Sequence, residues 1–400
     1  MAEDWALAPR WYLEAPVCAS EGYAGNDIRK IARRGGSRMT RRVAFVGPLP
    51  PPVNGFSSVC AMMLERLKTR MPVDVFNRAP KLHARAWGAL LQLLCPARYF
   101  RVCLGRHDVI LYLALSGGRG QFIDLIYVLI SKLFRRPMFV HHHSFVYINS
   151  PSWLNRCFFA LVRNATHIAL SPNMGQALVR VYGLNSAAII VLSNAAFYDS
   201  DDEARAVSND AAPLQLGFLS NITFEKGIVE FFRILEKLNQ CGVEYRAHIA
   251  GPLAPDARQT FDELLGAASD VEYVGPVYGG QKEQFYRQLD VFLFPTNYAN
   301  EAEPLVIYEA MRQGVHVIAC DRGSIAEMLL NGAGLAFTRE HIVDSAAAHI
   351  AKFNDDRPSL AAAKRNSMQQ AQRVRCAGKA ALENLLACMQ GTHEPARITQ

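Results

Sequence analysis

The residues best suited to chemistry lie in one segment, 294–311, where two glutamates are separated by seven residues. Glu301 follows a short apolar run with the length of a buried strand, and Glu309 lies inside a helical pattern. Glu309 has apolar neighbours on both sides, so a buried carboxylate there needs a partner.

The start of the same helix is a candidate anion site. Pro304 is expected at the first helical position, where its missing N–H costs nothing. The backbone N–H groups of Leu305 and Val306 then point out of the helix start and suit a phosphate. Glu303 is expected to cap the helix, since a negative charge there favours the helix dipole.

A second candidate segment, 218–227, follows another short apolar run and opens another helix. Lys226 stands at that junction, together with Asn221. Taken alone, Lys226 is best interpreted as an ordinary exposed lysine. Combined with the glutamate segment, it becomes a candidate for binding a diphosphate.

The loop 47–55 is rich in Pro and Gly and ends at Gly55, just before a predicted helix. It matches neither the GxGxxG fingerprint nor a Walker loop, which argues against a standard NAD site or P-loop. Gly55 would let the backbone approach a phosphate or an acceptor. A simple Pro-rich turn is the competing interpretation.

Three consecutive histidines, His141, His142 and His143, follow a predicted strand. They suggest a metal site, but adjacent residues on an extended chain point to opposite faces and chelate poorly. His143, which precedes the small Ser144, is the candidate for contact with a ligand. The other two are interpreted equally well as structural.

The elements that must position these residues alternate between strand and helix, which predicts two doubly wound parallel sheets and hence an α/β protein. We expect an N-terminal extension (1–40, disordered over 1–38), a Rossmann-like domain (41–198), an acidic linker (199–212), a second Rossmann-like domain (213–370) and a C-terminal helix and tail (371–400). Strands are predicted at 43–46, 73–76, 109–113, 138–141, 167–170, 188–192, 214–219, 245–250, 270–274, 291–294 and 315–319, and a long helix at 360–389.

The two glutamates, followed by Ala310-Met311 and by residues 314–318, resemble the motif of glycosyltransferase family 4 (glycosyl transferases group 1). The resemblance covers most of the second half and extends into the first. It implies the GT-B fold, in which two Rossmann-like domains face each other across a cleft.

The resemblance also implies a retaining enzyme that moves a sugar from a nucleotide-sugar donor without a metal or other cofactor. Glu301, Lys226 and His143 would carry the chemistry. Glu309 would bind the ribose hydroxyls of the donor. The remaining donor-binding positions are Asn221, Leu305, Val306 and Gly55.

The chain departs from the family pattern at Asn221, where an Arg is expected. One cation is therefore missing from the expected leaving-group site. Arg119 and Arg322 are candidates to replace it.

The net charge of +7 is unevenly distributed. Residues 41–195 contain 18 Lys and Arg but only 4 Asp and Glu, which predicts an anionic partner. The stretch 87–104 mixes Leu, Phe, Trp and Arg, and is a candidate for contact with an anionic membrane surface. Packing of a helix on the sheet explains this stretch equally well.

Cellular location follows from several absences in the sequence. The nine cysteines are scattered without a CxxC pair, and the best apolar stretch, 122–134, is too short and too charged to span a bilayer. No signal-peptide pattern is present at the N-terminus. We therefore expect a cytoplasmic protein, peripheral at the inner membrane.

The predicted activity is transfer of a sugar to a glycan or a lipid-linked acceptor, in the synthesis of a bacterial surface polysaccharide. Two alternatives remain open: a nucleotide-sugar epimerase and a non-catalytic GT-B scaffold. A nucleic-acid partner is not expected, because the basic residues are dispersed and no recognised motif is present.

Overall fold

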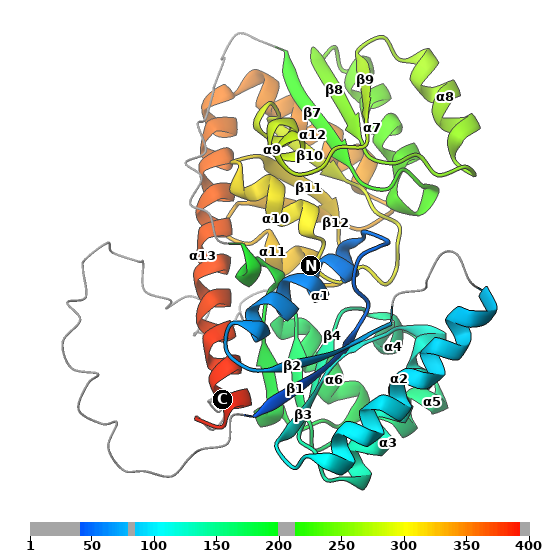
Figure 1. The fold of residues 1–400 in the computed structure, drawn as a ribbon. Coiled ribbons are helices and arrows are strands. Elements are labelled where there is room, and N and C mark those ends of the chain that lie inside the picture. Colours follow the sequence, from blue (N-terminus) through cyan, green and yellow to red (C-terminus); the bar gives the residue numbers. More distant parts are fainter. Residues whose placement is uncertain (1–40, 79–84, 199–212, 393–400) are drawn as a thin grey trace, which may run out of the picture.

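The protein has two α/β halves stacked one above the other (Figure 1). The computed structural model describes residues 41–78, 85–198 and 213–392, without the side chains of 85–93 and Arg119. The expectations for the extension 1–40 and the linker 199–212 lie outside the described residues.

The first half is built on a six-stranded parallel sheet with the strand order β2-β1-β3-β4-β5-β6. Most of its strands are apolar runs whose residues are buried, as expected for a parallel sheet covered on both faces. The strands are β1 (Arg42–Gly47), β2 (Val73–Asn77), β3 (Val109–Leu115), β4 (Met138–His142), β5 (Thr166–Ala169) and β6 (Ile189–Val191).

The second half repeats this design with the order β12-β11-β10-β7-β8-β9. The strand order reverses between β7 and β10, and ligands of open α/β sheets bind at such a switch point. The strands are β7 (Leu214–Leu219), β8 (Tyr245–Ala250), β9 (Val271–Gly275), β10 (Val291–Phe294), β11 (His316–Cys320) and β12 (Gly334–Phe337). The predicted fold class is confirmed, although β12 was not predicted.

Helices of the first half connect and cover the strands of its sheet. The first of them begins after a capping box, in which the Asn54 side chain accepts a hydrogen bond from the Ser57 backbone. The helices are α1 (Gly55–Lys68), α2 (Arg85–Gly105), α3 (Gln121–Leu133), α4 (Val146–Asn149), α5 (Trp153–Leu161) and α6 (Pro172–Tyr182).

The second half ends in a long helix that returns to the first half. This helix, α13 (Arg357–Gln390), runs along one side of both halves (Figure 1). Its last turns bury Leu385 and Met389 against Val43 and Phe45 of β1, so its two ends pack on different halves. The other helices are α7 (Ile228–Gln240), α8 (Arg258–Ala267), α9 (Gly280–Arg287), α10 (Leu305–Arg312), α11 (Ile325–Met328) and α12 (Ile342–Asp355).

Candidate active site

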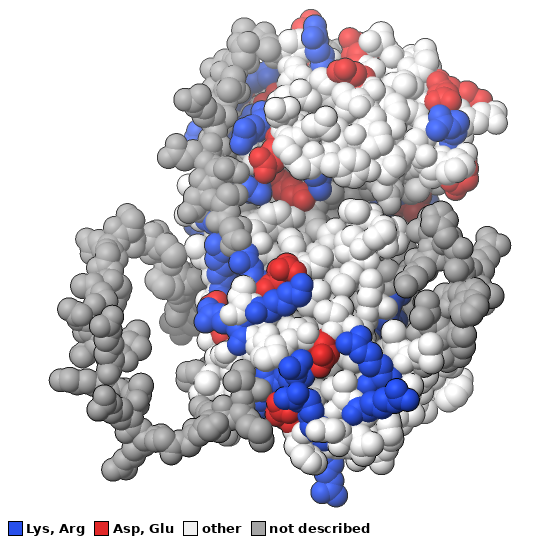
Figure 2. Space-filling view, in the orientation of Figure 1, with Lys and Arg blue, Asp and Glu red and all other residues white. Residues whose placement is uncertain are grey.

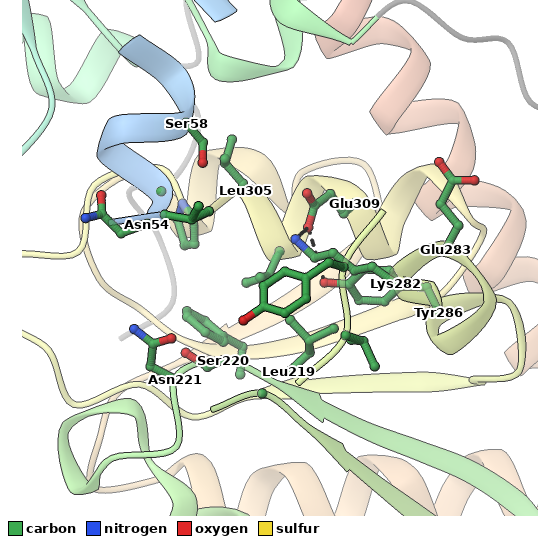
Figure 3. A pocket seen from close by; sticks show the side chains of 18 of the residues that line it. Asn54, Ser58, Leu219, Ser220, Asn221, Lys282, Glu283, Tyr286, Leu305 and Glu309 are labelled. Carbon is green, nitrogen blue, oxygen red and sulfur yellow. Dashed lines mark hydrogen bonds and ion pairs between the residues drawn. The ribbon is translucent and has the colours of Figure 1, made fainter. Parts of the chain in front are cut away.

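A cavity of about 580 Å³ lies between the two halves, at the switch point of the second sheet. Its walls come from the start of α1 in the first half and from β7, α9 and α10 in the second (Figure 3). The start of α1 contributes Asn54 and Gly55, and the loop after β7 contributes Ser220 and Asn221. A cleft of this size suits a small-molecule ligand.

Lys226 enters this cavity from the loop between β7 and α7. It ends the 3-10 helix Phe224–Lys226, which the Thr223 side chain caps through a 3.1 Å hydrogen bond from the Lys226 N–H. The Lys226 Nζ atom donates to Glu301 Oε2 over 2.5 Å and lies 5.0 Å from the ring centroid of Tyr298. The fold thus brings together two candidate residues that are 75 positions apart in the chain.

Glu309 faces the same cavity from α10 and has three partners. Tyr198 Oη donates to Oε1 over 2.9 Å, Tyr286 Oη donates to Oε2 over 3.4 Å, and Lys282 forms an ion pair with Oε2 (Figure 3). Burial, together with the Glu309 charge, raises the pKa of both tyrosines well above the usual value. Both therefore remain hydrogen-bond donors, and the Glu309 carboxylate is held in a fixed direction.

The start of α10 also lines the cavity, through Leu305 and Val306. Pro304 was expected to be the first helical residue, but its ψ of 122° is extended and the helix begins one residue later. The N–H groups of the first turn have no acceptor within the helix. Such a helix start can bind an anion, so the predicted anion site stays a prediction that this geometry allows.

Glu303 does not cap α10, contrary to the expectation, because the cap position is taken by Pro304. Its carboxylate instead accepts hydrogen bonds from Ser193 Oγ at 2.5 Å and from the Asn194 N–H at 2.6 Å. Burial raises the pKa of Glu303 to about 7, although these two hydrogen bonds lower it. Ser193 and Asn194 follow β6, so Glu303 joins the second half to the first.

A second cavity, of about 540 Å³, adjoins the first and shares Gly55, Glu301 and Leu305 with it. His143 lines this second cavity and contacts Phe56 in a tilted arrangement, with 4.8 Å between the ring centroids. Its Nε2 atom is buried and has no hydrogen-bond partner. Burial lowers the pKa of His143 to about 3, so the ring is neutral and can exchange a hydrogen bond with a ligand hydroxyl.

The two preceding histidines are structural. His142 bonds Tyr147 Oη at 2.9 Å and His167 at 3.1 Å, whereas His141 bonds Tyr112 Oη at 2.6 Å. Both rings are fully buried in the first half. Across the described residues, no three His, Cys, Asp or Glu side chains are grouped as they would be to hold a metal ion.

Asn221 lines the first cavity. Among the described side chains, the cations in the lining are Lys226, which the sequence singled out, and Lys282 and Arg312, which it did not. Arg322 is not in the lining of this cavity, and the side chain of Arg119 is not described. Lys282 lies on α9, whose polar sequence gave no signal that it would approach Glu309.

Comparison with known proteins identifies the second half. Residues 199–373 match the family model described as glycosyl transferases group 1. A lipopolysaccharide core biosynthesis mannosyltransferase, LpsB of Rhizobium meliloti (strain 1021), is 30% identical over 184 residues, which are 43% of this chain and 50% of the relative. The chain thus matches about half the length of this curated relative.

Solved structures share the arrangement of both halves. HepE of Anabaena in complex with UDP has a TM-score of 0.66 at 20% identity, covering 86% of this chain and 99% of that one. Sucrose-phosphate synthase of Thermosynechococcus elongatus has a TM-score of 0.63 at 14% identity, covering 88% and 100%. These likenesses show the GT-B fold. Residues 199–373 are the part of the chain that is similar to the glycosyl transferases group 1 family.

Proposed function

We propose that the protein is a retaining glycosyltransferase, which moves a sugar from a nucleotide-sugar donor to a glycan or lipid-linked acceptor. One observation carries the proposal. Lys226, Glu301, Glu309 and the start of α10 all line a single cavity between the two halves. A cation, two carboxylates and free helix N–H groups match the phosphates and hydroxyls of such a donor.

The donor would lie along α10. Its ribose hydroxyls would bind Glu309, and its diphosphate would lie between Lys226, the N–H groups of Leu305 and Val306, and Gly55. The sugar would then reach Glu301, which lines both cavities. The acceptor would enter the second cavity, where the unpartnered His143 Nε2 is available to a hydroxyl group.

The chemistry follows from where charge develops. Cleavage of the bond between the sugar and the diphosphate places negative charge on the diphosphate and positive charge on the sugar. Lys226 and the start of α10 would stabilise the leaving diphosphate without a metal ion. The departing phosphate oxygen would take the acceptor proton, and the acceptor oxygen would bond the anomeric carbon on the same face, which retains the configuration.

The pathway is proposed from similarity. LpsB is a mannosyltransferase of lipopolysaccharide core biosynthesis, and HepE was solved with UDP and with UDP-glucose. We propose a role in the synthesis of a bacterial surface polysaccharide with a nucleoside-diphosphate hexose as donor.

Donor turnover tests this function. The protein is incubated with UDP-, GDP- and ADP-hexoses and a bacterial lipid extract, and release of the nucleoside diphosphate and the anomeric configuration of the product are measured. Replacing Lys226 with Met should lower kcat by about 10²-fold or more, because a charged contact to the leaving group is lost. Lys237→Met is the control, since Lys237 pairs with Asp344 on an exposed surface.

Three results would contradict the proposal. An epimerised sugar formed without acceptor would indicate an epimerase. No consumption of any donor by the wild type would indicate a non-catalytic scaffold. An inverted product would exclude the retaining reaction.

A further inference from the structure

Helix α3 presents apolar side chains to solvent. Phe122, Leu129 and Leu133 are 57%, 49% and 69% exposed. Spacings of seven and four residues place all three on one side of a helix. An apolar stripe on a surface helix normally faces the core.

Other residues of α3 face the protein. Tyr127 and Val128 are fully buried in the core of the first half, and polar contacts lie beside them. Gln121 Oε1 accepts a 2.5 Å hydrogen bond from Asn155 of α5, and Ser131 Oγ bonds Tyr99 Oη of α2 at 2.7 Å. Asp124 is fully buried and forms an ion pair with Arg78. Core packing and polar contacts thus attach the helix to its domain, and Phe122, Leu129 and Leu133 are not among the side chains packed on that core.

Neighbouring helices extend this apolar surface. Ring contact between Phe100 and Phe134 at 5.1 Å joins α2 to the end of α3, and Lys132 Nζ donates to the Leu161 carbonyl of α5 over 2.9 Å. Seven of the twelve exposed large hydrophobic residues in the described part of the chain lie on these three helices. We call them the α2–α3–α5 face: Leu94, Phe100, Leu104, Phe122, Leu129, Leu133 and Trp153.

The surroundings of this face are basic. Residues 94–163 contain nine Lys and Arg but only two acids. One acid is the buried Asp124, and the other, Asp108, pairs with Arg106 at 3.3 Å. Lys and Arg are prominent over the lower half of the molecule in Figure 2. The exposed cations on or next to the three helices are Arg98, Arg101, Arg106, Lys132, Arg135, Arg156 and Arg163.

We propose that the α2–α3–α5 face docks on a membrane surface that carries anionic lipids. The apolar side chains would enter the headgroup region while the surrounding cations meet lipid phosphates. A second copy of the chain is a poorer occupant, because two basic faces would repel each other. The sequence assigned this contact to residues 87–104, whereas the structure places its centre on α3.

The helix lies on the bilayer rather than crossing it. With 13 residues α3 is about 20 Å long, well short of the roughly 30 Å hydrocarbon core. Across the described residues, no helix is long and apolar enough to cross a membrane.

The α2–α3–α5 face adjoins, along the chain, residues that line the second cavity. Gly117 and Gly118, just before α3, line that cavity, and so does Val146 of α4, a short distance before Trp153 in the chain. A lipid-linked acceptor could therefore pass from the membrane to His143 along a short path. This step rests on the proposed function, whereas membrane docking does not.

Vesicle flotation tests the inference. The full chain is mixed with phosphatidylcholine vesicles, with or without phosphatidylglycerol, at low and high salt. The wild type should bind only the anionic vesicles, and less at high salt. The variant Phe122→Ser/Leu129→Ser/Leu133→Ser should bind at least about tenfold more weakly, whereas the control Val274→Ser/Leu330→Ser should bind like the wild type.

Two further measurements separate the possible failures. Stabilisation of the triple variant by nucleoside diphosphates, equal to that of the wild type, would show that the fold and the donor site are intact. Sedimentation velocity reports the oligomeric state. Failure of the wild type to bind anionic vesicles, equal binding by the triple variant, or a wild-type dimer that the variant abolishes would each overturn the inference.

Discussion

Three glutamates within nine residues have three different environments. Glu301 pairs with Lys226, Glu303 accepts hydrogen bonds from the other half, and Glu309 meets two tyrosines and Lys282. The sequence predicted that two of these carboxylates face a ligand, because their spacing on a strand–loop–helix unit resembles a known motif. It could not predict the partners, which come from distant parts of the chain.

Glu303 should make stability depend on pH. Its pKa is raised from 4.5 to about 7 by burial, so between these values the folded state keeps a proton that the unfolded state has lost. Stability contributed by the neutral carboxyl is therefore present below pH 4.5 and is lost as the pH rises towards 7. The shift corresponds to about 3 kcal/mol.

Urea unfolding of the wild type and Glu303→Gln at pH 5 and pH 8 measures this effect. The amide stays neutral, so the variant should gain stability relative to the wild type by up to about 3 kcal/mol at the higher pH. Glu244→Gln, at an exposed carboxylate, is the control. A difference between wild type and Glu303→Gln that is the same at both pH values would show that Glu303 is ionised throughout.

At the scale of elements, the junction before α7 sets the position of Lys226. Gly227 has a φ of 84°, and a Cβ atom there would lie 1.9 Å from the Pro295 carbonyl oxygen at the end of β10. Only glycine allows the segment between β7 and α7 to approach the loop after β10 this closely. The Lys226–Glu301 contact depends on this approach, because each residue belongs to one of the two loops.

Replacing Gly227 with Ala should therefore lower stability and weaken nucleotide binding. Gly242→Ala is a matched control, since Gly242 has a φ of 68° but a Cβ atom added there would meet nothing within 4 Å. Both variants should lose about 1 kcal/mol through backbone strain, and Gly227→Ala a further 1–3 kcal/mol or so through the clash. Denaturant unfolding and nucleotide titration measure both effects. Equal losses in the two variants would contradict this role for Gly227.

Elements with clear apolar patterns were predicted well, and those without were not. The bounds of β7, β8 and β10 agree with the prediction, although only β10 is a continuous apolar run and the other two strands contain polar residues. Strand β12 has the sequence Gly-Leu-Ala-Phe, and glycine and alanine are uncommon in strands, so its pattern gave no signal. Helix α9 buries only Phe285 and Tyr286, and its polar remainder hid the element that carries Lys282.

The whole molecule shows features that local patterns cannot reveal. The sequence predicted a long C-terminal helix, but not that α13 would pack its last turns against β1 of the first half. It also could not show that Phe122, Leu129 and Leu133 of α3 face solvent, since this helix is apolar on more than one side and its sequence does not say which side is covered. Tertiary contacts decide both features.

The central claim is that a nucleotide donor binds the cavity between the halves through Glu309. Thermal unfolding with a panel of nucleoside diphosphates and nucleotide sugars tests it most directly, using the wild type, Glu309→Gln and Glu283→Gln. Glu283 also lines the cavity, but it is partly exposed and lies near Arg287. A ligand at about 100 times its Kd should stabilise the protein by about 2.7 kcal/mol. The account predicts that the wild type and Glu283→Gln show this stabilisation and that Glu309→Gln loses it. No stabilisation of the wild type, or equal stabilisation of all three proteins, would contradict the account.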